Sequence, residues 1–239
     1  MQIQKKYIMG KINNEIYKKC KAKGLSFNHV CEVGVYLPET SNVLDFILAG
    51  IKSTLVEPDP KNVKAIREFF KLNNNITLFP IAIFDYNGII ELSQRESSTF
   101  VSSLKASPAL VNDNYIKNEN DNFEVECKTF DCIDDGSIDL LSVDTEGCEW
   151  YVIKNLKSRP IVISIETHGK SYINPFIKEI TDWAKANQYV LWFKDHSDSV
   201  YVKKDLFIMT PIEKFKLRFK IISLAVNRVK YKMKKIIKR

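Results

Sequence analysis

Residues 138–150 read IDLLSVDTEGCEW, and this stretch decides the fold class of the chain. An apolar strand over 138–143 delivers Asp144 at its end, Gly147 permits a tight turn, and a helix is expected over 148–156. The next apolar strand, 161–165, ends in the same way with Glu166 and His168. Because parallel strands end at a common edge of their sheet, we expect Asp144, Glu166 and His168 to meet in one cleft.

Outward from this stretch, apolar strands alternate with helices. The expected strands cover 29–35, 53–56, 76–83, 88–92, 123–130, 138–143 and 161–165, and the expected helices 3–23, 40–49, 59–72, 148–156 and 175–187. A polar stretch, 94–121, is expected to be a loop. The pattern predicts an α/β fold with a mostly parallel sheet covered by helices on both faces. Two β-rich runs, 189–194 and 199–207, predict a terminal antiparallel hairpin, which the methyltransferase variant of the Rossmann fold has.

Composition is that of an ordinary globular protein, since 45% of the 239 residues are apolar and 27% are charged. No apolar run reaches the roughly 18 residues of a membrane-spanning helix, and the N-terminus shows no secretory signal. The five cysteines form no Cys-x-x-Cys pair, which argues against a zinc site or a disulfide framework. A reducing, cytoplasmic setting, with the inner face of the membrane as the other possibility, is the expectation.

Charge is distributed unevenly along the chain. Residues 211–239 hold eleven Lys and Arg and a single acid, Glu213, so their net charge is +10. The whole chain carries +7, which leaves −3 for residues 1–210. We expect three parts: an N-terminal helical extension over 1–27, a Rossmann-like domain over 28–210, and a basic amphipathic helix over 211–239.

The C-terminal helix carries one apolar stripe. Its members follow a spacing of four and three residues: Phe215, Phe219, Ile222, Val226, Val229, Met233 and Ile236. Lysines and arginines cover most of the remaining surface, which disfavours a self-paired coiled coil. The stripe either packs on the globule or a partner, or lies on an anionic membrane surface.

The nucleotide end of the sheet is marked by two acids. Glu32 and Gly34 end the first strand, and Glu57 ends the second strand 23 residues after Gly34. A carboxylate at about this distance usually accepts the ribose hydroxyls, and Pro58 would follow it against the adenine. The alternative is that Glu57 only caps the helix that begins with Asp59 and Pro60. No second or third glycine follows Gly34, which argues against a dinucleotide and is compatible with S-adenosylmethionine.

At this point the sequence resembles the FkbM family of methyltransferases. The matching pieces lie within residues 28–170: Glu32-Val33-Gly34, Val56-Glu57-Pro58-Asp59-Pro60, Ile81-Ala82-Ile83, Thr129-Phe130-Asp131, Leu141–Glu149 and Ile165-Glu166-Thr167-His168. The resemblance implies a class I enzyme that uses S-adenosylmethionine and commonly methylates hydroxyls, often of sugars. By position, it implies that Glu32, Gly34, Glu57 and Ala82 line the cofactor and that Asp144 and Glu166 face the acceptor.

Two kinds of chemistry fit these acids. A carboxylate or the His168 imidazole accepts the proton of the attacking hydroxyl, or a divalent ion such as Mg²⁺, held by Asp144 and Glu166, lowers the pKa of that hydroxyl. His168 also has a plain structural interpretation as a strand-end residue.

The leading expectation is therefore a sugar O-methyltransferase of glycan or polysaccharide biosynthesis, with a small-molecule or lipid-linked glycan as acceptor. An RNA methyltransferase is the first alternative, suggested by the basic tail. The chain lacks an Asn/Asp-Pro-Pro-Tyr/Phe motif and a basic patch near the cleft, so no specific nucleic acid is expected. The second alternative is a non-catalytic binding protein, suggested by the altered glycine loop.

Overall fold

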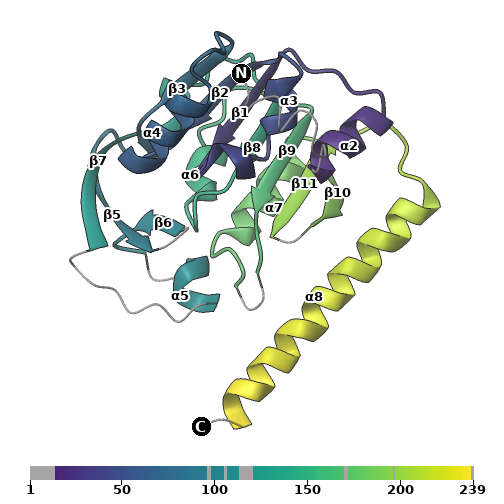
Figure 1. The fold of residues 1–239 in the computed structure, drawn as a ribbon. Helices are drawn as coiled ribbons and strands as arrows, with labels where there is room; N and C mark the ends of the chain where they lie inside the picture. Colours follow the sequence, from purple (N-terminus) through teal and green to yellow (C-terminus); the bar gives the residue numbers. More distant parts are fainter. Residues whose placement is uncertain are drawn as a thin grey trace.

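A seven-stranded sheet forms the centre of the molecule (Figure 1). The computed structural model describes residues 14–95, 98–104, 107–112, 121–169, 172–195 and 197–237. The strand order is β10-β11-β9-β8-β1-β2-β3. The strands are β1 (His29–Val33), β2 (Lys52–Val56), β3 (Ile76–Phe79), β8 (Leu140–Val143), β9 (Val162–Glu166), β10 (Tyr189–Lys194) and β11 (Asp198–Lys203). All neighbours are parallel except β11, which is antiparallel to both β9 and β10.

Strand β1 lies where the strand order reverses. It pairs with β2 on one side and with β8 on the other. Its side chains alternate between two buried clusters, with Val30 in one cluster and Cys31 and Val33 in the other. Both faces of the sheet are therefore covered, and the carboxyl end of β1 is the place where a doubly wound sheet binds its ligand.

Helices cover the two faces. Helices α2 (Glu15–Ala22), α3 (Leu44–Leu48) and α4 (Pro60–Phe69) pack with one cluster, and α6 (Glu149–Ile153) and α7 (Ile177–Ala186) pack with the other. Asp59 caps α4, because its side chain accepts a hydrogen bond from the Lys61 N–H, and Pro60 opens the helix. The predicted α/β fold and the terminal antiparallel hairpin are confirmed.

The expected N-terminal helix, 3–23, is described only from residue 14 onward. Asn14 caps α2 by accepting hydrogen bonds from the N–H groups of Ile16 and Tyr17. Ile16 and Cys20 of α2 are buried in the same cluster as Phe46 of α3. The helix therefore shares its core with the main sheet, and residues 3–13 lie outside the described part of the chain.

The strand predicted over 76–83 is in fact two strands in two sheets. Strand β3 ends at Phe79, and β4 (Ala82–Ile83) belongs to a second sheet with the order β4-β7-β5-β6. Its other members are β5 (Gly88–Arg95), β6 (Ser98–Val101) and β7 (Asn122–Lys128). The break falls at Pro80, whose ring fixes φ and which has no N–H to donate to a ladder.

The helix predicted over 40–49 is also wrong in its first half. A short 3-10 turn covers Pro38–Thr40, and α3 begins only at Leu44. The cause is Glu32, whose carboxylate accepts hydrogen bonds from the Ser41 hydroxyl (2.5 Å) and from the Asn42 N–H (2.7 Å). These bonds hold Ser41 in an extended conformation that a helix cannot include.

The polar stretch 94–121 is more ordered than a plain loop. It contains β6 and a short helix, α5 (Pro108–Asn112). Residues 96–97, 105–106 and 113–120 lie outside the described part of the chain.

The C-terminal helix, α8 (Pro211–Ile237), begins beside β10 and runs past the rest of the chain (Figure 1). Its stripe does not pack on the globule: Phe215, Phe219, Ile222, Val226, Val229 and Met233 are 45% to 70% exposed. The prediction that the stripe packs on the globule is thus wrong for these six residues. In the described part of the chain, no helix is both long and apolar enough to cross a membrane.

Candidate active site

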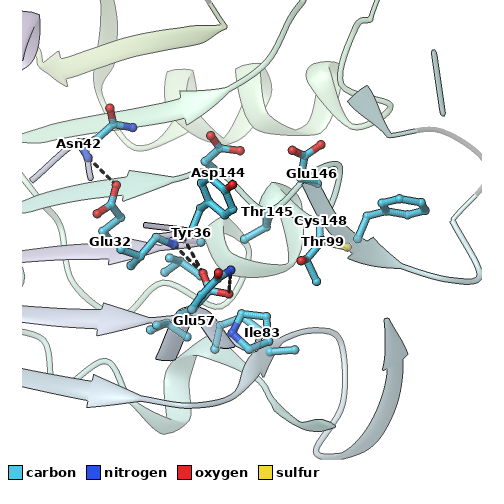
Figure 2. A pocket seen from close by; sticks show the side chains of 18 of the residues that line it. Glu32, Tyr36, Asn42, Glu57, Ile83, Thr99, Asp144, Thr145, Glu146 and Cys148 are labelled. Atoms are coloured by element: carbon cyan, nitrogen blue, oxygen red, sulfur yellow. Dashed lines mark hydrogen bonds between the residues drawn. The ribbon is translucent and has the colours of Figure 1, made fainter. Parts of the chain in front are cut away.

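A pocket of about 410 Å³ opens at the carboxyl ends of β1, β2 and β8 (Figure 2). This volume lies within the range of about 300–1,000 Å³ that is usual for small-molecule sites. The smaller sheet closes the pocket through Leu92 of β5 and through Thr99, Phe100 and Val101 of β6. Ile81, Ala82 and Ile83 line it as well, so the break at Pro80 turns the chain toward the site. The predicted cofactor residues Glu32, Gly34, Glu57, Pro58 and Ala82 all line this pocket.

Gly34 is required by the close approach of two strand ends. Its φ is +85°, and a Cβ built at this position would lie 1.7 Å from the backbone oxygen of Asp144. The Gly34 N–H donates to the Val56 carbonyl (2.9 Å), and the Asp144 N–H donates to the Val33 carbonyl (2.9 Å). The glycine therefore lets the ends of β1, β2 and β8 converge, which is a structural reason that the sequence interpretation did not include.

Two other loop residues of the pocket have unusual backbone conformations. Tyr36 has a φ of 57° and Glu146 a φ of 55°, both in the left-handed region that non-glycine residues seldom adopt. Such conformations cost free energy and gather at functional sites. Both residues line the pocket, Tyr36 in the loop after β1 and Glu146 in the loop after β8.

Glu57 is buried and holds the loop after β1. One carboxylate oxygen accepts from the N–H groups of Val35 (3.1 Å) and Tyr36 (2.7 Å). The other accepts from the Asp59 N–H (3.0 Å) and from the Asn62 amide (3.3 Å). Burial raises the pKa of Glu57, and these hydrogen bonds oppose the rise. Glu57 thus joins the glycine loop to α4 at the place where the sequence predicts the ribose.

Glu32 has a similar double role. It lines the pocket and accepts a hydrogen bond from the Asn42 N–H (Figure 2). Together with its hydrogen bond from the Ser41 hydroxyl, this contact fixes the turn before α3. Burial is the main cause that raises the pKa of Glu32 to about 8.

Three carboxylates meet at the ends of β8 and β9 and at the start of α6. Asp144, Glu149 and Glu166 each offer one oxygen, and these oxygens lie within 4.8 Å of one another. Glu149 is fully engaged: one oxygen accepts from the Thr145 N–H and hydroxyl and the Gly147 N–H, and the other from the Asn174 amide. Its carboxyl group therefore mainly organises the turn into α6.

Of the three carboxylates, Asp144 and Glu166 are the two that remain as candidates for a catalytic role. Asp144 lines the pocket, and the Oε2 atom of Glu166 is buried without a hydrogen-bond partner among the described residues. Burial, followed by the nearby Glu146, raises the pKa of Asp144 well above its usual value. Burial, followed by Asp144, does the same to the pKa of Glu166. Two such carboxyl groups share a proton or bind a cation.

The predicted meeting of Asp144, Glu166 and His168 in one cleft holds only in part. A carboxyl oxygen of Glu166 lies within 4.8 Å of one of Asp144, which lines the pocket. Glu166 and His168 themselves are not among the residues that line it. His168 is buried, its Nδ1 atom lies 3.0 Å from the Thr167 hydroxyl, and its Nε2 atom has no hydrogen-bond partner among the described residues. Burial lowers the pKa of His168 to about 3, so the imidazole is neutral near pH 7.

The sequence interpretation missed the acids of the terminal hairpin. Asp195 and Asp198 line the pocket, and β11 places Asp198 opposite Glu166 in the strand register. The hydroxyls of Ser164 (2.7 Å) and Ser197 (2.9 Å) donate to Asp198, and burial is the main cause that raises its pKa to about 7. The only signal in the sequence was a polar turn, which is common in hairpins without any function.

The pocket is strongly acidic. The described residues that line it include six carboxylates, Glu32, Glu57, Asp144, Glu146, Asp195 and Asp198, and no Lys, Arg or His. The pocket therefore attracts cationic ligands and repels anionic ones.

Comparisons with known proteins give one decisive match. The sequence model of the methyltransferase FkbM domain matches residues 32–191. No curated protein matches the chain.

Solved structures with a similar fold include the precorrin-6y C5,15-methyltransferase of Geobacter metallireducens. It is 13% identical, with 82% of this chain and 90% of that chain covered and a TM-score of 0.42. A second is an S-adenosylmethionine-dependent methyltransferase of Aquifex aeolicus, which is 10% identical, with 79% and 88% covered and a TM-score of 0.39.

The family match spans the glycine loop, Glu57, the acidic cluster and the smaller sheet, and it ends within β10, before Asp195 and Asp198 of the pocket. It favours the enzymatic prediction over the non-catalytic binding protein. The chain belongs to the FkbM family of methyltransferases and is an S-adenosylmethionine-dependent enzyme.

Proposed function

We propose that this enzyme transfers a methyl group to an uncharged hydroxyl of a sugar, in the synthesis of a glycan or its precursor. The observation that carries the proposal is the acidic pocket, which has six carboxylates and no cationic side chain among its described lining residues. Carboxylates accept hydrogen bonds from sugar hydroxyls, whereas the phosphates of a nucleic acid would be repelled. The lining thus favours a neutral polyhydroxyl acceptor over RNA.

The residues present fit S-adenosylmethionine. Gly34, which has no side chain, lines the pocket at the end of β1, and the carboxyl groups of Glu32 and Glu57 line it nearby. When bound, the cofactor supplies an electrophilic methyl group on a positively charged sulfur, and an acidic lining stabilises such a cation.

Asp144 is the proposed general base. It lines the pocket, and burial beside other acids raises its pKa, which makes it a stronger proton acceptor than an ordinary aspartate. In the transfer, the acceptor oxygen forms its new bond to the methyl carbon while the carbon–sulfur bond breaks, and Asp144 accepts the hydroxyl proton. Glu166 acts through Asp144 as a positioning residue, because it lies next to Asp144 outside the pocket lining.

A divalent cation is the other arrangement that the pair supports. Asp144 and Glu166 would hold it, since the Glu149 oxygens are already engaged by Thr145, Gly147 and Asn174. Such an ion would lower the pKa of the bound hydroxyl. A chelator separates the two arrangements. Loss of turnover on chelation, with recovery on addition of Mg²⁺, would show that the ion is required. Unchanged turnover would show that Asp144 accepts the hydroxyl proton without an ion.

The experiment is transfer of a labelled methyl group from S-adenosylmethionine to a panel of hydroxyl-bearing glycosides, with pooled RNA as the competing acceptor class. Label in a glycoside, sensitive to Asp144→Asn, supports the proposal. Label in RNA alone would contradict it. The reducing, cytoplasmic setting remains part of the proposal, because all five cysteines are free.

A further inference from the structure

Helix α8 presents two opposite faces. We name as the outer stripe its exposed apolar residues Phe215, Phe219, Ile222, Val226, Val229 and Met233. At about 100° per residue, these six fall within roughly 80° of the helix circumference. The less exposed residues Leu217, Lys220, Leu224, Arg228 and Tyr231 lie half a turn away. The Nε atom of Arg228 is buried, so this second face is turned toward the body of the protein.

The orientation of α8 is fixed at its first turn. The Glu213 carboxylate accepts hydrogen bonds from the Trp192 indole (3.2 Å) and the Thr210 N–H (2.8 Å), and it pairs with Lys23 (2.8 Å). Lys23 in turn lies 4.7 Å above the ring of Phe207. These contacts join the start of α8 to β10 and to the residue that follows α2, so the outer stripe is held away from the core.

Cations flank the outer stripe on both sides. Lys216 and Lys230 lie on one side of it and Lys214 and Arg218 on the other, by their positions around the helix. All four are exposed. The remainder of the chain, residues 1–210, has a net charge of −3, so the positive charge is concentrated on this helix.

We propose that the outer stripe of α8 docks the enzyme on an anionic lipid bilayer, with the helix lying in the plane of the interface. Apolar side chains enter the boundary between headgroups and acyl chains, while flanking lysines and arginines reach lipid phosphates. A second copy of α8 would place like charges beside each other, which opposes pairing through the stripe. A helix of 27 residues is about 40 Å long and is too polar to cross the membrane.

The test is co-sedimentation of the full chain with vesicles. One set contains phosphatidylcholine alone, and the other contains phosphatidylcholine and phosphatidylglycerol in equal amounts. We expect binding to the anionic set that weakens as salt is raised, and little binding to the neutral set. Neither measurement needs the cofactor or the acceptor, so its outcome is separate from that of the proposed reaction.

Matched variants locate the contact. Phe219→Asp should lower the vesicle partition coefficient at least roughly 10-fold, whereas Leu72→Asp, which also replaces an equally exposed apolar side chain but lies three residues beyond α4, should not. Lys216→Gln with Lys230→Gln should lower it by roughly 10-fold as well. Lys64→Gln with Lys185→Gln removes the same charge from exposed sites of the body and should leave it nearly unchanged.

Three results would overturn the proposal. The first is equal binding to both vesicle sets, and the second is wild-type partitioning of Phe219→Asp. The third is a Phe219→Asp variant that still binds vesicles but loses dimerisation in sedimentation velocity or loses RNA binding in a gel-shift assay, because the stripe would then serve a protein or a nucleic acid.

Discussion

Asp144 is the residue on which the chemistry depends. We expect Asp144→Asn to lower kcat at least roughly 100-fold, because the amide accepts no proton and is a poor ligand for a divalent ion. The dissociation constant for S-adenosylmethionine should change little, since Gly34, Glu57 and Pro58 follow other strands, β1 and β2. Single-turnover rates and calorimetry measure the two effects. Asp182→Asn, on the exposed surface of α7, is the control. A kcat near wild type would move the proton acceptor elsewhere, with His168 next to be tested.

Gly34 gives a second prediction at this scale. Gly34→Ala should lower the free energy of unfolding by at least about 3 kcal/mol, because its Cβ would overlap the Asp144 backbone oxygen at 1.7 Å. Gly50→Ala is the matched control: Gly50 has the same φ of +85° but nothing within 4 Å of a Cβ. It should cost only about 1 kcal/mol. Urea denaturation compares the two variants. Equal losses would mean that the backbone angle, and not the contact, requires Gly34.

The residues of the cofactor side could be found from the sequence because their spacing follows from the order of strands and turns. Glu57 was predicted from its distance to Gly34, and it lies in the pocket as expected. Its hydrogen bonds to Val35 and Tyr36 could not be predicted, because backbone N–H groups leave no mark in a sequence. Asp198 was missed for a related reason, since only the register of β11 against β9 brings it to the site.

At the scale of the element, Glu213 is the residue that fixes α8. Glu213→Ala removes the hydrogen bonds to Trp192 and Thr210 and the pair with Lys23. We expect faster hydrogen exchange throughout the first turns of α8, equivalent to a local loss of about 1–2 kcal/mol, with exchange in the main sheet unchanged. Glu179→Ala, at an exposed position in the first turn of α7, serves as the control. Unaltered exchange in α8 would show that its second face alone holds it.

Elements with strong local signals were predictable, and those shaped by distant contacts were not. Helix α4 has a capping Asp59 and Pro60 at its start, so its beginning is fixed locally. The segment 40–49 has a helical pattern, but Ser41 and Asn42 donate hydrogen bonds to Glu32 of β1, and these bonds prevent a helix at its start. The segment 76–83 reads as one apolar run, and only its pairing with two different sheets shows that Pro80 divides it.

For the whole molecule, the acidic pocket predicts a pH dependence of stability. Glu32, with a pKa of about 8, and Asp198, with a pKa of about 7, bind protons more tightly when folded than the unfolded chain does. Raised acids stabilise the fold fully below their unfolded pKa, and this contribution is lost as the pH rises through the folded pKa. The free energy of unfolding should therefore fall between pH 6.5 and about 8, by at least about 1 kcal/mol. His168, with a pKa of about 3, opposes this only at lower pH.

Denaturation by urea at several pH values measures this slope without cofactor. Glu32→Gln should flatten it, whereas Glu91→Gln, on the exposed side of β5, should leave it as in the wild type. Saturating S-adenosylmethionine should also flatten it, because a bound cation stabilises ionised carboxylates. A slope that is unaffected by Glu32→Gln would mean that this carboxyl is not the group that titrates.

The break at Pro80 has a consequence for how the enzyme can diversify. In the described part of the chain, the pocket is built by two sheets that share no strand pair, one carrying Gly34, Glu57 and Asp144 and the other carrying Thr99 and Phe100. Substitutions on β6 can accumulate while the register that converges at Gly34 stays intact. The wall of the pocket that β6 forms can thus be reshaped in a descendant of this chain while Gly34, Glu57 and Asp144 keep their positions.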